Sequence, residues 1–156
     1  MKTVHISAKE IAELLFGSGN ITSDRLMMAR AEEGILIHQF WQSQYTEKDQ
    51  KEVVVEAEYR ADDFLIDISG RIDGITIRNG EITLEEIKST RMDLEMIDET
   101  TSPAHLAQAK LYAYMYCFAN NLNKIIVRLT YITVENREVK TIDKSLTFKT
   151  LEKYFI

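Results

Sequence analysis

The stretch GRIDGITIRNGEITLEEIKST, residues 70–90, decides the fold. Asn79-Gly80 is the strongest short-range signal for a two-residue hairpin turn. Its flanks are rich in Ile and Thr, which strands favour. With Asn79 and Gly80 as the loop, Arg78 faces Glu81 and the pairing continues away from the turn. The sequence therefore predicts two antiparallel strands in a fixed register.

Charged residues occupy the far end of this hairpin. The register places Asp73 opposite Glu86 and Arg71 opposite Lys88, on one face of the sheet. Opposed carboxylates have Cβ atoms roughly 4.5–5.5 Å apart. The repulsion between their like charges destabilises the sheet unless a positive charge neutralises them. A hard divalent cation would do so, with Lys88 beside it. Two acids and a lysine suit phosphodiester hydrolysis, because metal and lysine stabilise the charge that develops on phosphate.

A second interpretation of the same residues stays open. Diagonal ion pairs, Asp73 with Lys88 and Arg71 with Glu86, would also balance the charges of an exposed sheet, and such pairs are common and individually weak. Glu85 points to the opposite face of the hairpin and is the weaker candidate ligand.

Outward from the hairpin, the chain alternates between helical and strand periodicity. A capping box of Ser7 and Glu10 opens the first helix, and Ser102 with Pro103 opens the helix before the last strands. We expect four helices, over residues 7–16, from Ser23-Asp24 to residue 44, and over residues 102–121 and 147–156. Gly17 and Gly19 are expected to end the first of them. Expected strands outside the hairpin cover 52–60, 124–134 and 138–146, and the strand 63–73 leads into it. This order predicts an α/β fold with a mixed central sheet flanked by helices.

Composition narrows the class of protein. The 156 residues are 45% hydrophobic, which suits a single globular domain over 1–156. The net charge of −6 argues against a protein held on nucleic acid by bulk charge. The lone Cys117 excludes an internal disulfide and an iron-sulfur cluster, and we expect it to be buried. With no signal peptide and no apolar run near the roughly 20 residues of a membrane span, we expect a cytoplasmic protein without membrane contact.

Three motifs resemble those of a known family. Asp73 followed by residues 86–88 (EIK) resembles the PD-(D/E)XK nuclease signature. Residues 108–112 (QAKLY) resemble the Q-x-x-x-Y motif of its RecB-like branch, and residues 34–38 (GILIH) resemble the upstream G-x-x-x-H of that branch. The order of the motifs is that of the branch, and the resemblance covers roughly residues 30–133.

The resemblance implies a restriction-endonuclease-like core and a Mg²⁺- or Mn²⁺-dependent nuclease that acts on DNA, with single strands or ends favoured. It implies metal ligation by His38, Asp73, Glu86 and the main-chain carbonyl of Ile87. It implies catalytic roles for Asp73, Glu86, Lys88, Gln108 and Tyr112. The four cysteines of the iron-sulfur members are absent, so no such cluster is expected.

Residues 104–116 and 125–133 also resemble an N-terminal region of some bacterial DinG-like DNA helicases. No phosphate-binding loop of the G-x-x-x-x-G-K-[ST] type is present, so a helicase motor would be a separate domain or subunit. The chain would then be an excised domain of a larger helicase that serves DNA repair or processing. Two alternatives remain: a catalytically inactive nuclease-fold module that binds DNA or docks a helicase motor, and an interaction domain that never meets nucleic acid. Weaker site candidates are Glu56, His105, Lys110, Arg128 and Trp41, each with a simpler role in packing or as a solvated charge.

Overall fold

A computed structural model describes residues 2–16 and 24–155 of the chain. The predicted end of the first helix, at Gly17 and Gly19, and the start of the second, at Ser23, lie outside these residues. The elements in chain order are β1 (Lys2–Ser7), α1 (Ala8–Phe16), α2 (Asp24–Gln42), β2 (Gln50–Ala61), β3 (Phe64–Arg78), β4 (Glu81–Thr90), a short 3-10 helix η1 (Leu94–Met96), α3 (Pro103–Asn120), β5 (Lys124–Thr133), β6 (Val139–Thr147) and α4 (Phe148–Phe155).

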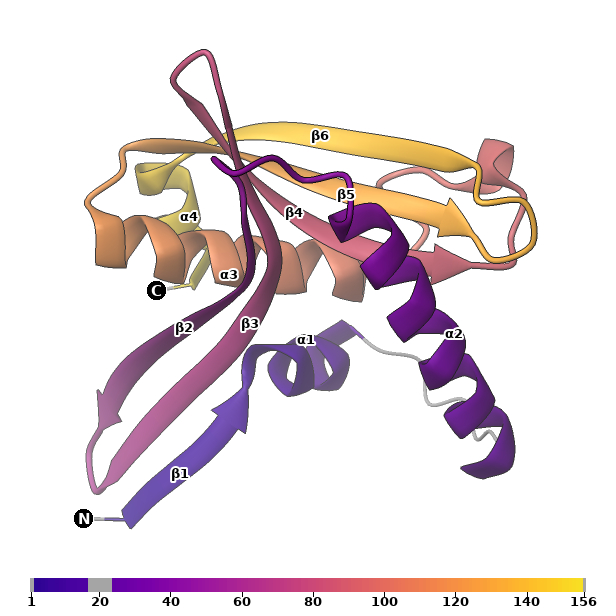
Figure 1. Ribbon diagram of the computed structural model, residues 1–156. Helices are drawn as coiled ribbons and strands as arrows, with labels where there is room; N and C mark the ends of the chain where they lie inside the picture. The colour runs from indigo at the N-terminus through magenta and orange to yellow at the C-terminus, as the bar shows by residue number, and fades with distance from the viewer. Residues whose placement is uncertain (1, 17–23, 156) are drawn as a thin grey trace.

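The architecture is the predicted mixed sheet with helices on both faces (Figure 1). The strand order is β1-β3-β4-β5-β6, and β2 pairs with β3 beside this path. β4 and β5 are parallel and are joined through α3, while β5 and β6 form an antiparallel pair. The α/β prediction is therefore confirmed.

The structure contains a strand, β1, that was not predicted from the sequence. It runs parallel to β3, with Lys2 opposite Phe64 and Ser7 opposite Ser69. Most of its side chains are exposed, so it lacks the apolar run of a buried parallel strand. Its strand conformation depends on a partner far along the chain, which local sequence does not reveal.

The hairpin register is confirmed near the turn and wrong beyond it. Pairing runs from Arg78 opposite Glu81 to Gly74 opposite Glu85 and then ends, so the predicted pairs of Asp73 with Glu86 and of Arg71 with Lys88 do not form. The reason is that a strand has two edges, and β2 covers one edge of β3 from residue 64 to 75. β1 and β4 must share the other edge, where β1 ends at Ser69 and β4 begins at Gly74. Residues 70–73 of β3 lie between them, and we call this gap the fork.

Each face of the sheet packs against different helices. On one face, Ile75, Leu84 and Val127 are buried against Ala109 and Met115 of α3, in the main core. On the other face, a smaller cluster is formed by Ile37 of α2 with Ile87 and Ile132, and Trp41 packs against it.

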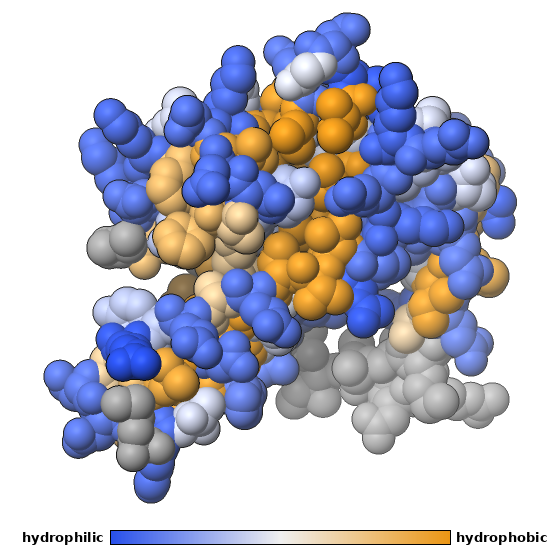
Figure 2. Space-filling model, turned by 60° about the vertical axis from the view of Figure 1, so that its left-hand side comes forward, coloured by the Kyte–Doolittle hydropathy of each residue, from blue (hydrophilic) through white to orange (hydrophobic). Residues whose placement is uncertain are grey.

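β1, β2 and the first half of β3 extend from the main sheet as a three-stranded arm (Figure 1). Exposed apolar side chains on the arm include Val54, Tyr59 and Phe64. On the side of the molecule that carries the arm, Figure 2 shows apolar residues as a band between charged ones. Across residues 2–16 and 24–155, we find no helix with the length and apolarity needed to cross a bilayer.

Candidate active site

Asp73 lies in the fork and is 7% exposed. Its Oδ2 accepts a hydrogen bond of 2.7 Å from the main-chain N–H of Ile87 on β4, so the side chain spans the gap that the two backbones leave open. His38 reaches the same carboxylate from α2, with Nδ1 3.6 Å from Oδ1. The fork thus brings residues of α2, β3 and β4 together at one carboxylate.

Glu86 faces the α3 side of the sheet and is 3% exposed. Lys88 Nζ lies 3.2 Å from its Oε1. The second carboxylate oxygen, Oε2, is buried and has no hydrogen-bond partner among the described residues. A buried oxygen without a partner is costly, so this atom is a natural place for a cation or a proton donor.

A chain of contacts continues from Lys88 to α3. The lysine Nζ donates to Gln108 Oε1 at 3.1 Å, and Gln108 Nε2 donates to the Tyr112 hydroxyl at 3.0 Å. Gln108 and Tyr112 are one turn apart and share one helix face, as their spacing predicts. The amide of Gln108 therefore links the lysine to the tyrosine.

Tyr112 enters the fork because Gly70 has no side chain. A Cβ built on Gly70 would lie 2.2 Å from Tyr112 Cε1, closer than any normal contact. Burial raises the pKa of Tyr112 to about 12, against smaller opposing effects of its hydrogen bonds with Gln108 and the Arg71 main chain. The phenol stays neutral and is available as a hydrogen-bonding group.

Burial controls the charge of the two acids. It raises the pKa of Asp73, although the hydrogen bond from Ile87 and the Lys88 ammonium oppose the shift. It raises the pKa of Glu86 as well; Lys88 opposes this shift and Asp73 adds to it. The interpretation of these residues as ion pairs on an exposed sheet is wrong, because both carboxylates are buried. Without a cation, the pair favours holding a proton.

Glu85 points to the opposite face, as its register predicts, and it anchors α2. Its carboxylate accepts hydrogen bonds from Trp41 Nε1 at 2.8 Å and from the hydroxyls of Tyr45 and Thr130. Trp41 lies one turn after His38 on α2. Glu85 therefore holds the end of the helix that presents His38.

Two neighbours of the site, Gln42 and Glu52, were not found from the sequence. Gln42 Nε2 donates to the main-chain oxygen of Asp73 and to Glu52 Oε1, each at 2.9 Å. The spacing of Gln42, four residues after His38 on the same helix face, is a signal that could have found it. Nothing in the local sequence marks Glu52.

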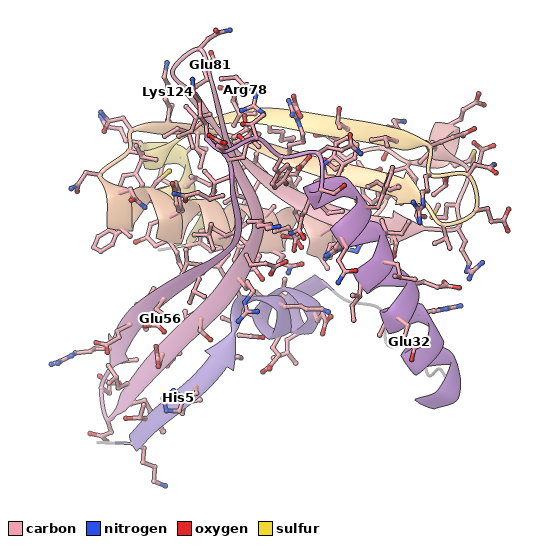
Figure 3. The ribbon with its side chains drawn as sticks, in the orientation of Figure 1. His5, Glu32, Glu56, Arg78, Glu81 and Lys124 are labelled. Atoms are coloured by element: carbon pink, nitrogen blue, oxygen red, sulfur yellow. The ribbon has the colours of Figure 1, made fainter. Side chains whose placement is uncertain are left out.

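The remaining candidates lie elsewhere or have other partners. Glu56 is exposed on the arm, away from the fork (Figure 3). Lys110 lies over the ring of Tyr154, and Arg128 forms two hydrogen bonds with Asp143. His105 Nδ1 lies 3.0 Å from the Tyr131 hydroxyl, and burial lowers its pKa to about 4. Cys117 is buried, as expected.

A divalent ion fits the donor set, although the side chains are not gathered around a point. Among residues 2–16 and 24–155, no group of three or more His, Cys, Asp or Glu side chains is placed to hold a metal ion. Mg²⁺ usually takes one or two carboxylates and keeps several waters. The orphaned Glu86 oxygen and the Asp73 carboxylate supply two carboxylates, and His38 Nδ1 lies 3.6 Å from Asp73 Oδ1.

Known proteins resemble this chain in family and in fold. A family model described as the PD-(D/E)XK nuclease superfamily matches residues 4–154. The crystal structure of SSO0001 matches with a TM-score of 0.61 and 20% identity, over 98% of this chain and 74% of that one, which shows a shared fold. A crystal structure described as "Putative exonuclease" from Eubacterium rectale matches with a TM-score of 0.43 and 14% identity, over 93% of this chain and 54% of that one. No curated protein matches the chain.

Proposed function

Because the chain belongs to the PD-(D/E)XK nuclease superfamily, we propose that it is a Mg²⁺- or Mn²⁺-dependent nuclease that hydrolyses DNA phosphodiester bonds. The observation that carries the proposal is the pair of buried acids, Asp73 and Glu86, of which one oxygen has no partner, next to Lys88. An inert domain gains nothing from burying two carboxylates whose charges repel.

Each residue of the site has a separate task in this proposal. Asp73 and Glu86 would hold the cation with the Ile87 carbonyl and His38. A divalent ion bound there would polarise the scissile phosphate and make a nearby water more acidic. The Lys88 ammonium would stabilise the charge developing on phosphate. Gln108 orients Lys88, and Tyr112 presents a neutral hydroxyl for placing the strand.

Assignment to the RecB-like branch rests on the motifs at residues 34–38 and 108–112 and on the contacts of His38, Gln108 and Tyr112. From that branch we infer single strands or free ends as substrates. A role in DNA repair beside a helicase motor rests on the likeness of residues 104–116 and 125–133 to DinG-like helicases. An affinity pull-down with a purified DinG-type motor would test that partnership.

The test of the activity is cleavage of labelled single- and double-stranded DNA with Mg²⁺, Mn²⁺ or EDTA. We expect cleavage that EDTA stops. Asp73→Ala should abolish it, because the cation loses a principal ligand. Lys88→Ala should reduce the rate roughly 10²–10³-fold, as loss of one transition-state donor does, while the cation still binds.

A matched control is Lys124→Ala, which removes an exposed lysine near the turn of the β3–β4 hairpin (Figure 3). It should cleave like the wild type. If the wild type cuts nothing and binds DNA equally well in EDTA, the chain is a non-catalytic nuclease-fold module. If cleavage survives Lys88→Ala unchanged, the role given to Lys88 is wrong.

A further inference from the structure

Glu52 interrupts the pairing of β2 and β3 at one position. Lys51 pairs with Gly74 and Val53 with Ile72, while Glu52, which stands opposite Asp73 in this register, makes no ladder pair. Its φ of +55° lies in the left-handed region, which residues other than glycine rarely adopt. The backbone is therefore turned out of the ladder beside Asp73.

The amide of Gln42 occupies the place that the ladder leaves. Its Nε2 donates both to the main-chain oxygen of Asp73 and to the Glu52 carboxylate, and Gln42 itself is buried. The Glu52 carboxylate thus lies two hydrogen bonds away from the main chain of Asp73. One amide fixes the position of both acids relative to α2, which also carries His38.

Glu52 is solvent-exposed, and its Oε1 meets the edge of the site through the Gln42 amide. Its negative charge raises the pKa of both Asp73 and His38. A second sign of a ligand at this site is the buried Oε2 of Glu86, which has no hydrogen-bond partner among the described residues. A buried carboxylate oxygen without a partner, at a site that holds further carboxylates, favours a cation.

We propose that Glu52 is a further carboxylate of the cation site, acting on the water shell of a bound divalent ion, with Gln42 as its positioning residue. This inference rests on the proposed function. Glu52 would act through water, because its hydrogen-bonded link to Asp73 in the described part of the chain runs through the Gln42 amide. Mg²⁺ and Mn²⁺ sites suit it, since Mg²⁺ keeps several of its waters in proteins.

The test is binding of Mn²⁺ to the purified chain, measured as loss of the free-ion signal in electron paramagnetic resonance. Glu52→Gln keeps an oxygen that accepts from Gln42 and removes the charge. We expect it to weaken Mn²⁺ binding roughly 10-fold. Such a loss is typical when a residue that hydrogen-bonds the ligands of a metal, without binding the metal itself, is replaced. In EDTA, the same variant should melt at or above the wild-type temperature, because one repelling charge is gone.

Two variants make the result specific. Glu56→Gln removes an exposed carboxylate from the same strand, farther along the arm, and should bind Mn²⁺ like the wild type (Figure 3). Asp73→Asn should lose binding. Wild-type affinity in Glu52→Gln, with binding lost in Asp73→Asn, would overturn the inference and leave the nuclease proposal standing. Absence of Mn²⁺ binding in the wild type would overturn both.

Discussion

Gly70 sets the position of Tyr112 by leaving space for its ring. In Gly70→Ala, the new Cβ would lie 2.2 Å from Cε1 and 3.0 Å from Cδ1 of the Tyr112 ring. The ring must therefore move out of the fork. We expect a loss of roughly 1–3 kcal/mol in the free energy of unfolding, as for other overpacked cores. Urea denaturation measures it, and DNA cleavage should fall in parallel.

Gly34→Ala is the matched control at the residue scale. A Cβ there meets Ser89 Oγ at 3.7 Å, an ordinary contact, and the residue lies within α2. Removing a glycine from a helix interior should add roughly 0.5–1 kcal/mol of stability. A Gly70→Ala variant as stable as the wild type would show that the Tyr112 ring is not held in the fork.

At the scale of elements, α2 is held to the sheet by a buried acid. Glu85→Ala would leave the donors of Trp41, Tyr45 and Thr130 without an acceptor in the interior. We expect the free energy of unfolding to fall by roughly 3 kcal/mol or more. Hydrogen exchange of the α2 amides should accelerate more than that of α3, because α2 supplies a donor to Glu85, namely Trp41, and no donor from α3 is found in the described part of the chain.

Glu81→Ala tests whether this effect belongs to Glu85 or to any acid on β4. Glu81 is exposed at the turn end of the strand (Figure 3), where a substitution is usually worth less than about 0.5 kcal/mol. Equal protection of α2 and α3 in Glu85→Ala would contradict the anchoring role.

The two elements of the hairpin also show what sequence can predict. Asn79 and Gly80 both have positive φ, the conformation their residue types favour, so the turn fixed the register as far as Gly74 and Glu85. Beyond that point, the pairing depended on β1, which takes the same edge of β3 from a distant part of the chain. Local signals do not report how two strands divide one edge.

The site shows the same division between local and distant information. Asp73, Glu86 and Lys88 could be proposed from the sequence, because they flank the Asn79-Gly80 turn and match a short motif. Their meeting point was predicted on a continuous sheet, whereas it lies in the fork, where Asp73 bonds the Ile87 N–H. Glu52 could not be found, because a hydrogen bond from Gln42 of α2 links it to Asp73, and local sequence does not show that contact.

At the scale of the whole molecule, a cation should stabilise the fold. An ion that binds only the folded arrangement adds about 2.7 kcal/mol at 100 times its dissociation constant. Millimolar Mg²⁺ or Mn²⁺ should therefore raise Tm in differential scanning calorimetry. Asp73→Asn should remove this gain. A Tm in the wild type that does not respond to either ion would count against the metal site.

The pairing of β1 with β3 has a consequence for the order in which the molecule folds. His5 and Asp67, which meet across these strands, are 62 residues apart in the chain. Closing so long a loop costs entropy before its contacts form, whereas the β2–β3 and β3–β4 hairpins close locally. β1 should therefore join after the barrier to folding, so that changes in β1 alter how fast the protein unfolds and leave its refolding rate nearly unchanged.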